Sequence, residues 1–564
     1  MSSRLSVRWL VLAALAALAG GFLYVGPCAA QTPQKIIADY IHAEGGARAL
    51  GKIQSLSIEG SVHLAASDDS SQRPDSPANS PADSSADSSA GSSSGSYSLI
   101  TKAPNKLYSE IIIEPQHFIA AYNGKSAWGQ ASSASPHTFT GREAAAWEAT
   151  ARYLNDRLLN AKKDRIAARL IGLDSVNGHR AYHLEFTFAP GVTRDVFFDA
   201  QTHLIVREIV NGPQQAGGQA SGGSPTAGAQ ASSPDSGSAA APADPAEQYD
   251  YDDYQPVDGI PEPRKIELRR AGRVYQIAVT RVEINGPVKD SIFDFPRAHS
   301  RPLPDIAQLL RDIQKNQKAT DEIVKQYTCH LSEEEEKTGS NGEVTSHSVK
   351  EYDIFYVGDD EIRHLLAKDG QPLEGDEKKK EDQRFSKEFD EAKKKQAELA
   401  SDPKKQQKEE EREEAQISDF LRAENFTNPR REIFRGQEVI VFDFGPNPEY
   451  KPKNMAETLV QKLVGVIWVD EQARDVVRLE ARFSDNFKIA GGLLASLSKG
   501  SNFVFEQTMV NNEVWLPSYD EVHAAARLVF VKVRANQIDR YSNYKKFSSE
   551  IKLGTSAPVE EKPQ

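Results

Sequence analysis

The sequence predicts an α+β protein in which two β-rich domains of one kind follow each other along the chain. The clearest signal lies at residues 177–210, where apolar and polar residues alternate in short runs separated by turn sequences. The same order of a turn followed by alternating runs returns at residues 435–483. An amphipathic helix is predicted ahead of each pattern, at 33–50 and 304–327. These observations indicate a duplication of architecture, although not of close sequence.

The first domain is expected over residues 31–298. Asn123-Gly124 and Asn177-Gly178 are turn pairs typical of β-hairpins. Residues 142–161 carry apolar side chains at helical spacing and predict a helix in the middle of the domain. The predicted strands cover 55–64, 97–113, 116–122, 125–130, 182–188, 192–198, 204–210, 264–269 and 274–282.

Two stretches of this domain, 65–96 and 214–246, contain no Leu, Ile, Val or aromatic residue. Such a composition cannot bury enough apolar surface to offset the entropy lost on ordering the chain. We therefore predict two disordered inserts, the first of them between two strands.

The second domain is expected over 301–550, with a flexible tail at 551–564. Residues 374–415 form a charge-dense insert with a narrow apolar stripe that includes Phe385 and Ala392. Either a helical hairpin laid on the domain or a mobile charged helix in solvent fits this pattern. Residues 417–426 correspond in order to the helix in the middle of the first domain. The predicted strands cover 344–357, 361–367, 439–444, 464–469, 476–483, 503–508, 515–524 and 528–533.

Residues 1–30 have the pattern of a signal peptide. Arg4 and Arg8 precede an apolar run from Trp9 to Val25, and small residues suit cleavage before Gln31. A retained membrane anchor is the alternative, because the run is near the lower limit for a membrane span. We expect a periplasmic protein, free or anchored by this segment.

Net charge narrows the classes of possible partners, and the cysteine count excludes an intrachain disulfide in the cleaved chain. The formal net charge is −13, and loss of the first 30 residues would change it to −15. Such an acidic surface disfavours nucleic acids and anionic membrane surfaces. Only Cys329 would remain after cleavage, so no intrachain disulfide is possible and the cores must hold the fold.

No motif for catalysis or metal binding stands out. The sequence has no nucleophile elbow, phosphate-binding loop, paired cysteine ligands or helical histidine pair. Cys329 and His330 adjoin at the predicted end of a helix, but no motif places a third catalytic residue. Residues 249–254 are acidic and aromatic but lack the ligand spacing of a calcium loop, so we interpret them as a solvated loop. We expect a binding protein without cofactor or metal, and not an enzyme.

Diffuse motifs in both halves point to one family. In the first half they are Ala43-Glu44-Gly45-Gly46, 196–199 with Thr202 and Leu204, and 253–259; in the second they are 465–470 and 514–517. With these motifs the chain resembles the LolA/LolB/LppX group of periplasmic lipoprotein carriers and outer-membrane lipoprotein-sorting proteins, over 32–297 and more loosely over 303–547. The resemblance implies a strongly curved antiparallel β half-barrel wrapped around helices, with an apolar concave side that holds acyl chains. Two domains, two inserts and a charged helix set this chain apart from a simple carrier.

Two functions follow from this resemblance. The first is a periplasmic carrier or binding protein for lipoprotein acyl chains or other lipids. The alternative is an envelope sensor similar to the RseB group, which pairs a LolA-like domain with a second domain and regulates a membrane protein partner.

Strand parity selects the candidate residues of an apolar ligand cavity, because alternate side chains of a strand share a face. The same side chains could instead be ordinary core between sheet and helices, and parity does not say which face is concave. The candidates are Leu184, Phe186, Phe188, Phe198, Phe442, Phe444, Trp468, Phe483, Phe503 and Phe505.

Overall fold

The computed structural model describes residues 31–546 except 66–93, 133, 165, 190–191, 212–246, 297–300, 340–343, 359, 403–416, 453, 490–494 and 529–530. The signal-peptide pattern, nearly all of both predicted inserts and the predicted tail therefore lie outside the described residues. The chain divides into two compact units. The N-terminal unit contains the described residues up to Arg301 and also Arg430–Glu438, and the C-terminal unit contains the described residues of Pro302–Pro429 and of the chain from Val439 onward. None of the described helices combines the length and the apolar character needed to cross a membrane.

One antiparallel sheet of 13 strands forms the N-terminal unit, in the order β6-β5-β4-β3-β2-β1-β13-β12-β11-β10-β9-β8-β7. The path is open, with β6 and β7 at its ends, and β1 pairs with β13 near its middle. The predicted meander is confirmed as β8, β9 and β10. The strands are β1 Ser55–Leu64, β2 Ser94–Lys102, β3 Lys106–Ile113, β4 Gln116–Tyr122, β5 Ala127–Ala131, β6 His137–Thr138, β7 Ala167–Val176, β8 His179–Ala189, β9 Val192–Asp199, β10 Ile205–Asn211, β11 Glu247–Val257, β12 Ile260–Arg270 and β13 Arg273–Ile284.

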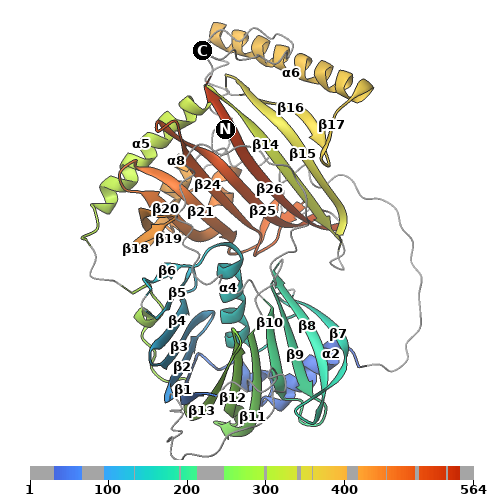
Figure 1. The fold of residues 1–564 in the computed structure, drawn as a ribbon, viewed down its shortest axis with the longest axis vertical. Helices are drawn as coiled ribbons and strands as arrows, with labels where there is room; N and C mark the ends of the chain where they lie inside the picture. The colour runs from blue at the N-terminus through green and yellow to red at the C-terminus, as the bar shows by residue number, and fades with distance from the viewer. Residues whose placement is uncertain are drawn as a thin grey trace, which may run out of the picture. The chain divides into compact units, whose positions relative to one another are not determined.

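Three α-helices of this unit lie at the two positions that the sequence predicts. The first predicted helix is divided into α2 (Pro33–Ala43) and α3 (Ala47–Leu50) by Gly45 and Gly46, whose φ angles of 93° and 87° suit glycine. Thr32 caps α2 by accepting a hydrogen bond from the Lys35 amide. Helix α4 (Gly141–Asp156) contacts strands of both halves of the sheet, and Figure 1 shows it between the β1–β5 strands and the β8–β10 strands. A 3-10 helix, Asp290–Ile292, follows the last strand.

The C-terminal unit repeats this strand order around a second sheet of 13 strands. Its path is β17-β16-β15-β14-β26-β25-β24-β21-β20-β19-β18, so that the first and last strands, β14 and β26, again pair inside the path. The strands are β14 Tyr327–Thr338, β15 Val344–Val357, β16 Asp360–Lys368, β17 Gln371–Pro372, β18 Glu424–Phe434, β19 Gln437–Pro446, β20 Leu463–Asp470, β21 Asp475–Phe483, β22 Phe487–Ile489, β23 Ala495–Leu497, β24 Asn502–Val510, β25 Val514–Leu528 and β26 Val531–Lys546.

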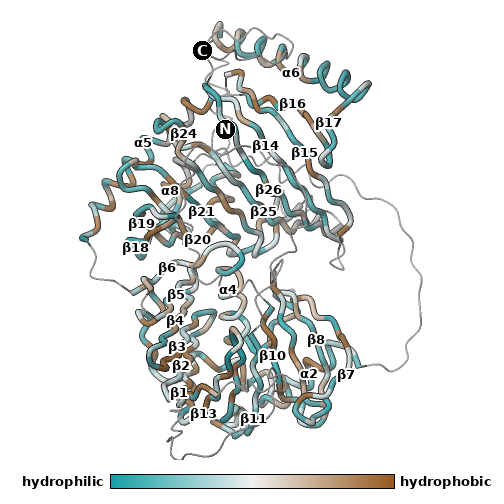
Figure 2. Tube along the Cα trace, viewed as in Figure 1, coloured by the Kyte–Doolittle hydropathy of each residue, from teal (hydrophilic) through white to brown (hydrophobic). Residues whose placement is uncertain are grey.

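The described helices that accompany the second sheet are α5 Ile306–Val324, α6 Gly375–Ser401, α8 Ile417–Ala423 and α9 Met455–Val460. Helix α6 is the first arm of the charged insert, and it is mostly hydrophilic in Figure 2. Its apolar stripe nevertheless packs on the sheet, because Phe385 and Ala392 are buried against Val357 and Ile362. The described arm is therefore laid on the unit, and the rest of the predicted hairpin lies outside the described residues.

Three local predictions differ from the structure. Residues 249–254 belong to strand β11 and not to a solvated loop. Cys329 and His330 lie in strand β14, beyond the end of α5, because the alternation of Tyr327, Cys329 and Leu331 buries one face of a strand. Strand β2 already begins at Ser94, inside the first predicted insert, because backbone pairing with β1 does not require apolar side chains.

Candidate ligand-binding cavity

A cavity of about 220 Å³ lies between α4 and the inner face of the N-terminal sheet. A single buried water needs roughly 10–15 Å³ on this measure, so the cavity is far larger than a water site. Residues from β1, β2, β3 and β12 form its apolar floor, and Trp147 and Leu154 of α4 face that floor. The apolar floor consists of Leu56, Ile58, Tyr97, Leu99, Leu107, Ile111, Ile266 and Leu268.

Helix α4 presents one face to the cavity. Glu143, Ala146, Trp147, Thr150 and Leu154 line it, and their spacing of three or four residues places them on a single stripe. Two of these side chains, Ala146 and Thr150, are small. We infer that the cavity exists because they do not fill the concavity of the sheet beneath them.

A buried guanidinium in the lining of the cavity is shared by two carboxylates. Arg157, which has a left-handed φ of 48° directly after α4, donates to Glu44 at 2.7 Å and to Glu262 at 2.5 Å. Glu44 comes from the Glu44-Gly45-Gly46 turn, and its side chain is only 5% exposed. Burial raises the pKa of Glu44 to about 7, and Arg157 acts in the opposite direction. One guanidinium cannot neutralise two carboxylates, so a proton held on Glu44 balances the charge.

A second buried pair joins Arg194 of β9 to Glu208 of β10 at 2.8 Å. Arg194 also donates to the Thr150 hydroxyl at 3.0 Å and lies over the ring of Tyr153. The hydroxyls of Tyr153 and Tyr251 donate to Glu208. Each partner also forms further hydrogen bonds. These bonds help to offset the free-energy cost of removing the two charges from water.

The third arginine of the lining is Arg270 of β12. It forms an ion pair with Glu247 at 2.9 Å, and Glu247 also accepts a hydrogen bond from the Tyr249 hydroxyl at 2.9 Å. Glu143 in the first turn of α4 also lies near Arg270. Burial raises the pKa of Glu143 to about 7, while Arg270 opposes that shift.

Three tyrosines of β11 line the cavity, although the sequence analysis places them in a solvated loop. Tyr249 and Tyr251 alternate with Asp250 and Asp252, which is the period of a strand with one aromatic face. Tyr254 also lines the cavity, although it breaks this parity. The intervening Asp253 has a left-handed φ of 55°, which accounts for the change. The alternation of tyrosine and aspartate was the signal that could have identified this strand.

Comparison with known proteins gives structural likenesses only. No family model and no curated protein matches the chain. A LolA superfamily protein from Nitrosomonas europaea matches 47% of this chain and 98% of its own length, at 14% identity and a TM-score of 0.27. The complex of MucA and MucB from Pseudomonas aeruginosa matches 91% of this chain and 99% of its own, at 6% identity and a TM-score of 0.16. At these values the likeness concerns the fold and says nothing of a ligand.

The candidate residues of the first half lie beside the cavity of the N-terminal unit and not in its lining. Leu184, Phe186 and Phe198 are buried in a cluster with Ile36 and Tyr40 of α2. They share the inner face with the lining, since Phe186 pairs directly with Arg194 across β8 and β9. Phe188, which is partly buried, packs against the same cluster. Helix α2 covers this part of the face, so ligand contact by these four residues stays a prediction.

Most candidates of the second half share one face of the C-terminal sheet. Phe444 lies in a cross-strand row with Gly465, Ala481 and Phe503, and Phe442 lies in a neighbouring row with Phe505. Phe442, Phe444 and Phe483 are buried with residues of α5, α8 and α9, and Phe503 and Phe505 pack on that cluster.

Trp468 is the exception among these candidates. Its neighbours Ile467 and Val469 belong to the cluster, so Trp468 points to the opposite face, where Arg478 lies 5.8 Å from its ring.

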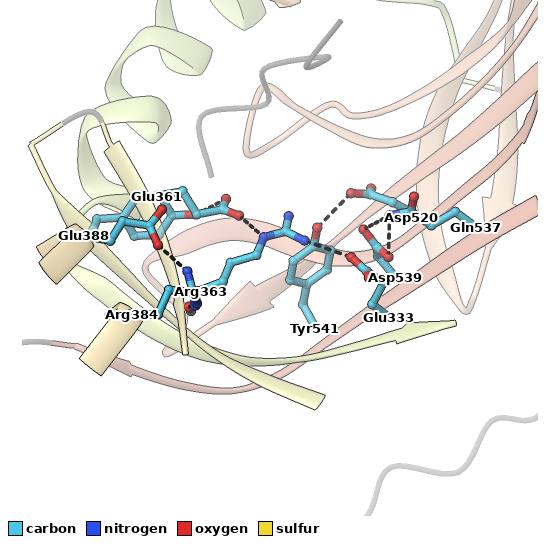
Figure 3. A network of polar contacts seen from close by, with 10 residues as sticks. Glu333, Glu361, Arg363, Arg384, Glu388, Asp520, Gln537, Asp539 and Tyr541 are labelled. Atoms are coloured by element: carbon cyan, nitrogen blue, oxygen red, sulfur yellow. Dashed lines mark hydrogen bonds and ion pairs between the residues drawn. The ribbon is translucent and has the colours of Figure 1, made fainter. Parts of the chain in front are cut away.

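The same face of the C-terminal sheet becomes acidic beyond Phe505. Direct cross-strand pairing continues from Phe505 to Asp520, Asp539 and Glu333. Figure 3 shows Arg363 between Glu361 and Glu333, to which it donates at 2.8 and 3.0 Å. Tyr541 donates to Asp520 at 3.2 Å. Within the described residues, no group of three or more His, Cys, Asp or Glu is arranged to hold a metal ion.

Burial shifts the pKa values of the two aspartates of this network. Burial, together with repulsion by Asp539, raises the pKa of Asp520 to about 8, and burial raises the pKa of Asp539 to about 6. One oxygen of Asp520 is buried without a hydrogen-bond partner among the described residues. Because the two carboxylates lie directly opposite each other, the folded unit favours the protonated form of Asp520.

Proposed function

We propose that this protein is a periplasmic binding or carrier protein for lipoprotein acyl chains or another lipid. Its ligand occupies the cavity of the N-terminal unit, and the chain is not an enzyme. The observation that carries this proposal is the apolar floor of that cavity, which the side chains of α4 leave uncovered. Concave apolar sites with a few polar groups are the usual places where small apolar ligands bind.

The composition of the lining supports a ligand with an apolar chain and a polar group. Leu56, Leu107 and Ile266 offer hydrocarbon contacts, whereas Arg157, Arg194 and Arg270 are polar groups of the wall that are held in ion pairs. Burial of methylene groups contributes roughly 0.8 kcal/mol each. An acyl chain of about ten carbons therefore has enough apolar surface for stable binding in such a site.

Filling the cavity tests this proposal. Ala146→Phe adds a ring on the lining face of α4, whereas Ala145→Phe adds the same ring one residue away, outside the lining. We expect wild type and Ala145→Phe to bind the hydrocarbon probe diphenylhexatriene with similar affinity. The Ala146→Phe variant should bind it about tenfold or more weakly, since the ring occupies the space of the probe. Circular dichroism and thermal melts show whether each variant is folded.

Two outcomes contradict the proposal. One is no probe binding by the wild-type protein, and the other is equal loss in folded Ala145→Phe and Ala146→Phe variants. The envelope-sensor alternative predicts instead that a membrane protein partner co-purifies with the protein and that no lipid does.

A further inference from the structure

The cavity contains more carboxyl groups than cations. Among the described residues, its lining includes five glutamates and three arginines and has no lysine or histidine. Each arginine already has a carboxylate partner, which is Glu262 for Arg157, Glu208 for Arg194 and Glu247 for Arg270. Glu44 and Glu143 are the two carboxyls in excess. Glu44 shares Arg157 with Glu262 and so has a hydrogen-bond donor already.

Among the described residues that line the cavity, Glu143 is the one with a buried polar side-chain atom that lacks a hydrogen-bond partner. Its Oε1 atom is buried and has no hydrogen-bond partner among the described residues. It lines the cavity from the first turn of α4, and the nearby Arg270 is committed to Glu247. A buried acceptor without a donor is unfavourable, and a ligand that supplies the donor removes this penalty.

We infer that the polar end of the ligand is a hydrogen-bond donor, an amine above all or else a hydroxyl or amide, which binds Glu143. A carboxylate or phosphate end is disfavoured. This inference rests on the proposed binding of an apolar chain in the same cavity and adds the chemistry of the other end of that ligand. When Glu143 is ionised it repels an anionic end, and no arginine of the lining is available without breaking a buried ion pair.

Three ligands with the same chain test the inference: dodecylamine, dodecanol and dodecanoate. Each is titrated below its micelle concentration at pH 8 against diphenylhexatriene bound to the full-length protein. With Glu143 ionised, we expect dodecylamine to displace the probe best, dodecanol next and dodecanoate least. The difference in affinity between amine and carboxylate should be about tenfold or more.

Two variants assign that preference to one side chain. Glu143→Gln keeps an acceptor but removes the charge, so the difference between amine and carboxylate should fall about fivefold or more while dodecanol binding stays within about twofold. Glu148→Gln makes the same change on α4 outside the lining and should leave the preference unchanged. Glu143→Ala, which removes the acceptor as well, should also weaken dodecanol binding.

The outcomes separate this inference from the proposed function. Equal binding of the three ligands, preference for dodecanoate, or identical behaviour of the Glu143→Gln and Glu148→Gln variants overturns the inference and leaves an apolar site in place. Displacement by none of the three overturns the proposed function and this inference together.

Discussion

The two units have sheets with the same strand order, yet different side chains cover their inner faces. In the N-terminal unit, α4 crosses the face with Ala146 and Thr150 and leaves a cavity. In the C-terminal unit, α5 and α8 place Leu309, Ile313 and Phe420 against the sheet, and all three are fully buried. The strand order is shared, and we infer that the size of the helix side chains decides where the covered face becomes core and where a cavity remains.

The units also differ in how they bury charge on that face. The N-terminal unit pairs each lining arginine with a glutamate. The C-terminal unit aligns Asp520, Asp539 and Glu333 in neighbouring strands, and Glu333 forms ion pairs with Arg363 and Lys350. The first arrangement pairs three of the five lining glutamates with one arginine each, whereas in the second burial raises the pKa of both Asp520 and Asp539.

The largest expected change in the free energy of unfolding comes from placing a charge on the aromatic face beneath the helices. It tests whether this face is core in both units. Phe186 and Phe442 are fully buried, so Phe186→Asp and Phe442→Asp each place an unpaired charge in a core. We expect each change to destabilise its own unit by about 5 kcal/mol or more, visible as loss of one transition in urea melts followed by circular dichroism. Leu173→Asp, at a residue of β7 that is 42% exposed, is the control and should cost less than about 1 kcal/mol.

A folded Phe186→Asp variant that no longer binds diphenylhexatriene would contradict the core interpretation. It would show that the ligand extends beneath α2, where strand parity places Leu184, Phe186 and Phe198.

A smaller effect concerns the acidic half of the C-terminal face. The folded-state pKa of Asp520 lies at about 8, above the ordinary value of 3.8, so between these values the folded state holds a proton that the unfolded state has lost. The free energy of unfolding should therefore fall as the pH rises from about 4 to 8. Asp520→Asn keeps the acceptor for Tyr541 and removes the charge.

We expect the Asp520→Asn variant to be more stable than wild type by about 1–3 kcal/mol at pH 8 and equally stable near pH 4. Urea melts of the C-terminal unit across this pH range measure the difference. The exposed Asp390→Asn on α6 should follow the wild-type curve. A wild-type stability that is constant over the same range contradicts a protonated Asp520.

Much of the fold follows from local sequence signals. Alternation in β8, β9 and β10 and the Asn177-Gly178 turn predicted the meander, because one face of these strands is buried by apolar side chains. The same parity correctly grouped Phe442, Phe444, Phe503 and Phe505 on one face. It could not place Trp468, because the strand that contains it is apolar on both faces and alternation then carries no signal.

The cavity could not be predicted in the same way. Its position depends on which helix covers which part of the sheet, and this depends on contacts between distant segments such as α4 and β12. Tyr249, Tyr251 and Tyr254 were obscured by the acidic residues between them, which face away from the cavity. In the sequence Glu44 could be recognised only as part of a motif. Its buried environment includes Arg157 and Glu262, which lie far away in the sequence.

The central claim is that the N-terminal cavity holds a lipid, and the most direct test is the lipid that the protein itself carries. Wild type, Ala145→Phe and Ala146→Phe would be purified from the periplasm without detergent and weighed intact by native mass spectrometry, followed by extraction and identification of bound lipid. We predict bound lipid in near one-to-one amount on wild type and Ala145→Phe, and little on Ala146→Phe. Lipid-free wild-type protein, or equal lipid on all three folded proteins, would contradict the claim.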